Sequence, residues 1–375
     1  MGEVKFEKEI EGDSEELNII NPFDIKSIKV SNKVISLESL IKRLKFEEID
    51  LTPEFQRNPD LWDRKKMSRL VESIILRLPL PIFYFDVSDD NKWIVIDGLQ
   101  RLSTFKKFIV EDKLRLSNLE FLTELNGKKY SELGRSIERI IEETQINTYQ
   151  IEPQTPKEVR YSIFNRINTG GLTLNSQEIR QALNQKNNGV RYLKEIVEDD
   201  IFKEIVKIKT QRMLDRELVL RYIAFKLNSY EEFYKKEIEL SKFLDKTMEL
   251  IDQEDFTEEQ FNRLKEEFFE SLKFLSIIFE VGTLFNKKIV DETKTATLNR
   301  SLFEIWTVLI SNLTNEEKEK IYKNRELLKK KYKELLRSVE FEEAVTKGTN
   351  SRKSVKTRFE KLSFLLEEIK NVERS

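Results

Sequence analysis

Five consecutive residues near position 100 combine the chemical groups that bind a nucleotide phosphate. Residues 97–101 read Asp-Gly-Leu-Gln-Arg and offer a carboxylate, a glycine, an amide and a guanidinium. Glycine lets the backbone approach a ligand, Arg101 can donate charge-assisted hydrogen bonds to phosphate, and Asp97 can hold a divalent cation. The same residues are also typical of an ordinary Asp-Gly turn, with Arg101 paired to a surface carboxylate. Taken alone, the segment favours the turn.

Residues 164–171 form a second polar cluster of similar composition. Its amide, guanidinium and glycine residues are Asn165, Arg166, Asn168, Gly170 and Gly171. Arg166 and the glycine pair could clamp a phosphate, and Asn168 could bind a base, a ribose or a metal-bound water. A glycine C-cap between two helices explains the same pattern without any ligand. A third cluster, Gln56 and Arg57, is more typical of packing or of surface pairing.

Histidine and cysteine are absent from all 375 residues. This absence excludes zinc fingers, HNH-type nucleases, Ser-His-Asp triads and thiol nucleophiles, because each needs an imidazole or a thiolate at the reacting centre. The missing cysteines fit a reducing compartment, and no apolar run is long enough to span a bilayer. The acidic N-terminus also lacks the features of a secretory signal. We therefore expect a cytoplasmic protein with no membrane partner.

The charges are balanced, because 66 Lys and Arg residues stand against 68 Asp and Glu residues. Any surface for nucleic acid must therefore be local. The most basic window, 346–361, contains one acidic residue and the cations Lys347, Arg352, Lys353, Lys356, Arg358 and Lys361. Three interpretations stay open for it: contact with DNA phosphates, a packed or solvated helix surface, and a role in capping the last helix, in the nucleotide site or in an oligomer contact.

Apolar spacing, caps and prolines predict the elements that position the first two clusters. Strands are expected over 82–87, 93–96 and 145–151, and helices over 37–44, 67–75, 102–109 and 159–167. The caps that begin helices in this region are Ser36, Asp63, Thr155 with Glu158, and Asn175 with Glu178. Asp97 is thereby placed where a strand, a glycine turn and a helix start meet.

The second half of the chain has a different character, because it contains no proline after about residue 190. Helices are expected over 216–227, 231–251, 258–279, 300–313, 316–337 and 355–370, with capping boxes at Thr257 with Gln260 and at Thr314 with Glu317. The composition shift predicts three parts. They are an N-terminal extension over 1–34, an α/β domain over 35–188 and an all-helical domain over 189–375, so that the chain is predominantly helical.

Four segments occur in an order and spacing that make them more specific together than singly. They are 53–57 with Trp62, 78–81, 95–102, and 164–171 with Asn175 and 178–180. Together they resemble the N-terminal domain family of the GmrSD restriction endonucleases, also called the DGQQR family. The resemblance implies a fold related to the ParB and sulfiredoxin nucleotide-binding domains, with a small mixed sheet. It also implies a bound nucleoside triphosphate with Mg²⁺, and hydrolysis of that nucleotide in several members.

Carried over by position, the resemblance assigns a signature loop of Asp97, Gly98, Gln100 and Arg101. The companions that it implies in nucleotide binding are Gln56, Arg57, Asn165, Arg166, Asn168, Gly170 and Gly171. The implied catalytic residues are Asp97, Gln100 and Arg101, with Asp97 at the Mg²⁺ and with Arg101 and Arg166 neutralising triphosphate charge. The first glutamine of the signature is Leu99 here, so any contact made by that amide is lost.

Members of the family that cut DNA commonly carry a C-terminal HNH nuclease domain, which a chain without His cannot form. We therefore expect a sensor or effector of bacterial restriction or anti-phage defence, with any nuclease on a separate subunit. It is expected to hydrolyse the nucleotide slowly, and nucleotide state would control its engagement of DNA or of a partner. Two alternatives stay open: a Mg²⁺-dependent DNA nuclease that uses carboxylates, and a non-catalytic nucleotide-binding module. A homo-oligomer is compatible with each.

Overall fold

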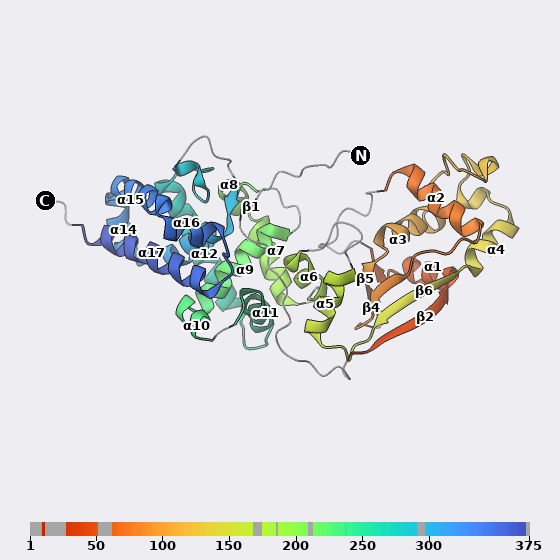
Figure 1. Cartoon of the computed structure of the whole chain (residues 1–375), viewed down its shortest axis with the longest axis horizontal. Coiled ribbons are helices and arrows are strands. Elements are labelled where there is room, and N and C mark those ends of the chain that lie inside the picture. Colours follow the sequence, from red (N-terminus) through yellow and green to blue (C-terminus); the bar gives the residue numbers. More distant parts are fainter. Residues whose placement is uncertain are drawn as a thin grey trace. The chain divides into compact units, whose positions relative to one another are not determined.

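The computed structural model describes residues 10–11, 28–51, 62–89, 91–167, 175–184, 187–208, 213–236, 238–290 and 297–372. The chain divides into two compact units (Figure 1). We call Leu17–Leu183 the α/β unit, and Asn184–Ser375 together with Met1–Glu16 the helical unit. Among the described residues, no helix is long and apolar enough to cross a membrane.

A five-stranded mixed sheet organises the α/β unit. Its strands, in spatial order, are β2 (Val30–Ser36), β6 (Gln145–Ile151), β4 (Phe83–Asp86), β5 (Trp93–Asp97) and β3 (Ile49–Asp50). The pairs β2/β6 and β4/β5 are antiparallel, whereas β4/β6 and β3/β5 are parallel. The strands predicted from sequence at β4, β5 and β6 are confirmed. Strand β2 was not predicted, because most of its residues are exposed and show no clear alternation of apolar and polar side chains.

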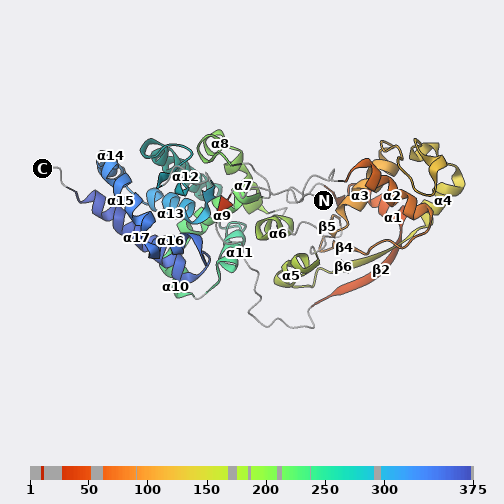
Figure 2. The same cartoon turned by 45° about the horizontal axis from the view of Figure 1, so that its top comes forward.

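Helices cover one face of this sheet (Figures 1 and 2). The helices of the unit are α1 (Leu37–Lys45), α2 (Arg64–Ile75), α3 (Leu99–Phe105), α4 (Arg135–Glu143), α5 (Lys157–Ile167) and α6 (Ser176–Leu183), with short helical turns at Lys106–Val110, Thr123–Leu125 and Tyr130–Glu132. The predicted caps at Ser36 and Asp63 are confirmed, since their side chains accept hydrogen bonds from Ser39 N at 3.2 Å and Lys66 N at 2.7 Å.

The core of the α/β unit lies between the sheet and α1, α2 and α3. Phe83, Phe85 and Val95 have no exposed surface, and they alternate with less buried positions along their strands. Phe83 stacks on Phe85 with ring centroids 6.3 Å apart and also contacts Phe105 of α3. Helix α3 is therefore held against the strands by fully buried aromatic rings, which contact it at its last residue.

The helical unit is built around a second core of its own. Its elements are β1 (Ile10–Glu11), α7 (Asn188–Glu198), α8 (Asp200–Val206), α9 (Leu214–Leu227), α10 (Tyr230–Lys235), α11 (Leu240–Leu250), α12 (Glu258–Ile278), a turn at Lys287–Ile289, β7 (Leu298–Asn299), α13 (Arg300–Ser311), α14 (Asn315–Lys323), α15 (Arg325–Arg337), α16 (Val339–Thr346) and α17 (Arg352–Lys370). The short strands β1 and β7 pair in parallel. The predicted capping boxes that begin α12 and α14 are confirmed.

The prediction of one helix over 231–251 is wrong, because α10 and α11 are separate. Phe233 of α10 and Phe243 of α11 both pack on Phe225, with ring centroids 5.6 and 5.0 Å away. Residues ten positions apart in one straight helix point in different directions, so a single helix could not bring both rings onto Phe225. The break allows this three-ring contact.

The prediction of one helix over 316–337 is also wrong, since α14 ends and α15 begins at Asn324. The backbone of Asn324 departs from helical geometry, with φ −102° and ψ 18°. Its side-chain amide donates to the main-chain oxygens of Ile369 at 3.2 Å and Val372 at 3.4 Å, at the end of α17. The angle between the two helices is therefore tied to a distant part of the chain.

Candidate functional site

The turn from β5 into α3 requires a glycine for two separate reasons. Gly98 has a φ of 108°, in the left-handed region that glycine adopts at little cost. A Cβ at this position would lie 2.4 Å from Cδ1 of Phe83, which is a fully buried core residue. The shape of the turn is therefore set by its packing on the core.

Arg101 is buried and binds the segment that leads into β4. One Nη donates to the main-chain oxygen of Pro81, and the other donates to that of Ile82 at 3.2 Å. The guanidinium also lies 4.1 Å from the centre of the Phe83 ring. Burial lowers the pKa of Arg101, and Asp97 acts in the opposite direction. Arg101 therefore joins the start of α3 to the entry of β4.

The carboxylate of Asp97 is oriented by this arginine. Its Oδ2 accepts a hydrogen bond from Nη2 of Arg101 at 2.8 Å, yet 44% of the Asp97 side chain is exposed, against 9% for Arg101. Asp97 thus presents a fixed carboxylate to solvent. Among the described residues, no group of three or more acidic side chains could hold a metal ion. Asp97 fits Mg²⁺ that arrives with a polyphosphate, because such ions are often held by one or two carboxylates plus phosphate oxygens.

The other two residues of the loop contact protein groups. Oε1 of Gln100 accepts a hydrogen bond from the backbone N–H of Trp62 at 3.3 Å, which joins α3 to the residue before the N-cap of α2. Leu99 is partly buried and packs against the core of the α/β unit. An apolar side chain at position 99 therefore has a structural explanation within this fold.

Comparison with protein families identifies this part of the chain. Residues 37–185 match the family model of the GmrSD restriction endonuclease, N-terminal domain. The α/β unit is a GmrSD N-terminal domain. The match includes the β5–α3 turn, and it relates the chain to DNA restriction and defence systems. Searches of the curated proteins and of the solved structures found no match.

The GmrSD N-terminal domain carries the remaining predicted site residues on two segments. Gln56, Arg57, Asn168, Gly170 and Gly171 lie outside the described residues. Asn165 and Arg166 lie in the last turns of α5, where the side chain of Arg166 is exposed. Helix α5 lies against β5, the strand that ends at Asp97.

A buried polar cluster that was not predicted from sequence holds α5 in this GmrSD domain. Asp86, at the end of β4, is 1% exposed and accepts hydrogen bonds from the backbone N–H of Ser88 at 2.8 Å and from the Ser88 hydroxyl. Arg160 of α5 donates to Ser88 Oγ at 2.5 Å and lies 3.4 Å from Asp86 Oδ2. An aspartate at the end of an apolar strand, two residues before a serine, was the available signal. The cluster fixes α5 against the sheet.

Helix α6 of the domain begins with the predicted capping box. The backbone N–H of Asn175 donates to Glu178 Oε2 at 2.6 Å, and the N–H of Glu178 donates to Asn175 Oδ1 at 2.8 Å. Several polar side chains of the helix are buried, and Gln177 and Arg180 have no exposed surface. The motif at 178–180 therefore contributes to packing as well as to the cap.

The basic window outside the GmrSD domain is divided between surface and core. Lys347 pairs with Glu343 at 3.8 Å, and Lys361 pairs with Glu340 at 2.8 Å. Lys356 pairs with Glu360 at 3.8 Å and lies over a tyrosine ring. Lys353 is exposed, and Arg352 is partly exposed. The predicted cap is confirmed: the hydroxyl of Ser351 accepts from the N–H of Ser354 at 3.1 Å, at the start of α17.

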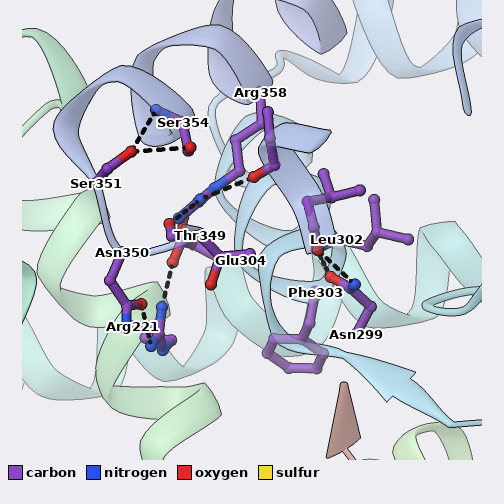
Figure 3. A network of polar contacts seen from close by, with 12 residues as sticks. Arg221, Asn299, Leu302, Phe303, Glu304, Thr349, Asn350, Ser351, Ser354 and Arg358 are labelled. Atoms are coloured by element: carbon purple, nitrogen blue, oxygen red, sulfur yellow. Dashed lines mark hydrogen bonds and ion pairs between the residues drawn. The ribbon is translucent and has the colours of Figure 1, made fainter. Parts of the chain in front are cut away.

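Arg358 corrects the expectation of DNA contact for one residue of this window. It has no exposed surface, and its Nη2 lies 2.7 Å from Oε1 of the equally buried Glu304. Nη1 donates to the main-chain oxygen of Thr349 at 2.5 Å. Arg221 of α9 reaches the other oxygen of Glu304 at 3.1 Å and Asn350 at 3.3 Å (Figure 3). Arg358 therefore joins α13, α17 and the loop before α17, and it does not belong to a DNA-binding surface.

Proposed function

We propose that this chain is a nucleotide-controlled component of a DNA restriction or defence system, and that it binds a nucleoside triphosphate with Mg²⁺ at the β5–α3 turn. The observation that carries the proposal is the pairing of Asp97 with Arg101. A buried arginine holds a partly exposed carboxylate in one orientation, at a glycine turn that leads directly into the start of helix α3. This arrangement suits a cation that bridges protein and phosphate.

In this proposal the two charged residues have different tasks. Asp97 holds Mg²⁺ or orients the attacking water, and Arg101 positions Asp97 and contributes positive charge close to the phosphates. Arg166, which is exposed on α5, supplies further charge, and Gln100 steadies the start of α3 through Trp62. A single carboxylate favours slow hydrolysis, because several carboxylates or metal ions are usual where phosphoryl transfer is fast.

The proposal extends to the fold and to the partners. We include in it a relationship of the domain to the ParB and sulfiredoxin nucleotide-binding domains, supported by the mixed sheet and by the strand–glycine–helix junction at Asp97. The helical unit would engage DNA or a separate nuclease subunit according to nucleotide state. In this proposal the cations that contact DNA are Lys347, Arg352, Lys353 and Lys356, which are exposed or partly exposed.

The test is nucleotide binding by the wild type and by Asp97→Asn. Each nucleoside triphosphate with Mg²⁺ is added while the thermal midpoint is followed, and the dissociation constant is then measured by calorimetry. We expect one or more triphosphates to raise the midpoint of the wild type, because a ligand that binds only the native state stabilises it. Asp97→Asn should weaken binding about tenfold or more, which corresponds to about 1.4 kcal/mol.

Asp63→Asn is the matched control. It also removes a carboxylate from the α/β unit, but asparagine caps a helix as well as aspartate does, so α2 should persist. Phosphate release that depends on Asp97 supports an NTPase, and tight binding without release supports a non-catalytic module. If no triphosphate changes the midpoint of the wild type, the proposed function is wrong.

A further inference from the structure

Among the described strands, β2 forms one edge of the sheet and has a neighbour on one side alone. It is seven residues long, it stands at the end of the strand order, and β6 is its partner among the described strands. The register between β2 and β6 runs without a bulge from Val30 opposite Ile151 to Ser36 opposite Gln145. Proteins usually protect such an edge with a proline, a bulge or an unpaired charge. Strand β2 has no proline and no bulge.

The hydrogen bonds of the β2–β6 ladder show which backbone groups face outward. Next to the ladder, Glu152 N donates to Lys29 O at 2.9 Å and Leu37 N donates to Thr144 O at 2.8 Å. In an antiparallel ladder every second residue bonds to the neighbouring strand, so the odd-numbered residues of β2 bond to β6. The N–H and C=O groups of Val30, Asn32 and Val34 therefore point away from β6.

These three outward residues form a self-complementary pattern. If a second β2 lies antiparallel with Asn32 opposite Asn32, then Val30 of each strand faces Val34 of the other. All three facing pairs are then of the hydrogen-bonded kind and supply about six backbone hydrogen bonds. Val30 is 41% exposed and Val34 is 56% exposed, so both side chains would bury apolar surface in such a pair.

The charges of the strand permit this contact. Lys33 is the one charged residue of β2, and its Nζ lies 3.7 Å from Glu152. The hydroxyl of Ser31 also donates to Glu152 at 2.6 Å. In the register centred on Asn32, each Lys33 faces Ser31 of the other copy, so no like charges are directly opposed.

We infer that β2 is the interface of a symmetric dimer, in which the β2 strands of two copies of this chain pair antiparallel about Asn32 and join two sheets into one. A twofold axis through Asn32 makes each half of the contact identical, as closed dimers require. The interface is small, so the dimer should dissociate on dilution. The inference does not depend on nucleotide binding.

The experiment uses the full chain in three forms: the wild type, V30K/V34K and V30E/V34E. In the proposed register, V30K/V34K places lysine opposite lysine in both outer pairs, and V30E/V34E places glutamate opposite glutamate. Each alone should raise the dimer dissociation constant about tenfold or more relative to the wild type. An equimolar mixture should dimerise again, because every lysine then faces a glutamate. Sedimentation velocity over a wide range of concentrations measures the dimer dissociation constant of each form and of the mixture.

Asn32→Pro provides a second test, in which the fold of the single chain should be preserved. A proline on an edge strand, with its nitrogen toward solvent, leaves the β2–β6 ladder intact. It removes the two central hydrogen bonds of the dimer, so the dissociation constant should rise. Circular dichroism confirms that each variant is folded. A wild type that stays monomeric at the highest concentration, doubly charged variants that dimerise alone, or a mixture that remains monomeric would each overturn the inference.

Discussion

The guanidinium of Arg358 lies 2.7 Å from the carboxylate of Glu304, and neither side chain has any exposed surface. Arg221 shares the same carboxylate at 3.1 Å, so one buried acid serves two arginines from α9 and α17. Burial lowers the pKa of Arg358, while Glu304 opposes that change. The charges are tolerable inside the helical unit only because they neutralise one another and are hydrogen-bonded.

Replacing Glu304 by Gln should therefore destabilise the helical unit strongly. The variant removes the carboxylate that pairs with the buried Arg358, whereas Arg221 keeps its ion pair with Glu217 at 2.9 Å. Removal of one partner from a buried ion pair costs about 3–5 kcal/mol. Hydrogen exchange of the α13 and α17 amides measures the loss. Glu340→Gln is the control, because it breaks the exposed pair with Lys361 and should cost about 1 kcal/mol or less. Equal effects of the two substitutions would contradict the importance of the buried network.

Gly98→Ala should destabilise the α/β unit more than Gly127→Ala. Both glycines have positive φ, 108° and 84°, but a Cβ at Gly127 meets nothing within 4 Å, whereas one at Gly98 meets Phe83. We expect about 1 kcal/mol for Gly127→Ala from backbone strain alone. A further 1–3 kcal/mol, roughly, is expected for Gly98→Ala from displacement of a core ring. Thermal unfolding of both variants gives the comparison, and a smaller loss for Gly98→Ala would contradict it.

Arg101→Lys should disturb the candidate site although the charge is retained. Lysine cannot reach Pro81, Ile82 and Asp97 together in the planar geometry of a guanidinium, and it loses the stacking on Phe83. A loss of about 1–3 kcal/mol in unfolding free energy is expected. Arg43→Lys is the matched control, since Arg43 also stacks on a ring and pairs with a carboxylate, but it is more exposed. Denaturant unfolding should show a smaller loss of unfolding free energy for Arg43→Lys than for Arg101→Lys.

Acid should remove the contribution of Glu317 to stability. Lys370, at 2.7 Å, together with the N–H of Thr314, lowers the pKa of Glu317 from 4.5 to about 2. A carboxyl with a lower pKa in the folded state stabilises that state above pH 4.5, and the contribution is lost as pH falls toward 2. Glu317→Gln keeps the capping box, since Gln also serves at that position.

The measurement is the thermal midpoint of the wild type and of Glu317→Gln across this pH range. The wild type should be the more stable at pH 6, and the difference should shrink as the pH falls below about 4.5. A difference that stays constant with pH would show that the carboxylate charge of Glu317 does not contribute.

Sequence was a sound guide where the deciding interactions are local. Helix α1 with its Ser36 cap, the capping boxes of α12 and α14, and strand β6 all follow from residues a few positions apart. The same holds for the glycine turn at Asp97, because Asp-Gly after an apolar strand is a local signal. Backbone conformation at such points depends mainly on neighbouring residues.

The breaks inside two predicted helices could not be predicted from neighbouring residues. Neither the segment between α10 and α11 nor Asn324 carries a proline or a glycine. Both breaks are stabilised by contacts with other helices. Phe233 and Phe243 pack on Phe225 of α9, and the main chain at the end of α17 accepts a hydrogen bond from the side-chain amide of Asn324. Such contacts outweigh helix propensity, which amounts to less than about 1 kcal/mol per residue.

By itself, the sequence determined the two-part composition of the chain, the absence of histidine chemistry and the presence of the glycine turn with its carboxylate and arginine. Only the tertiary structure decided where the charged side chains lie. Arg101 and Arg358 look like surface cations in sequence, yet both are buried, Arg101 against the main-chain oxygen of Ile82 and Arg358 against the carboxylate of Glu304. An arginine can leave water only when carboxylates and carbonyl oxygens from other elements surround it, and the fold alone assembles those partners.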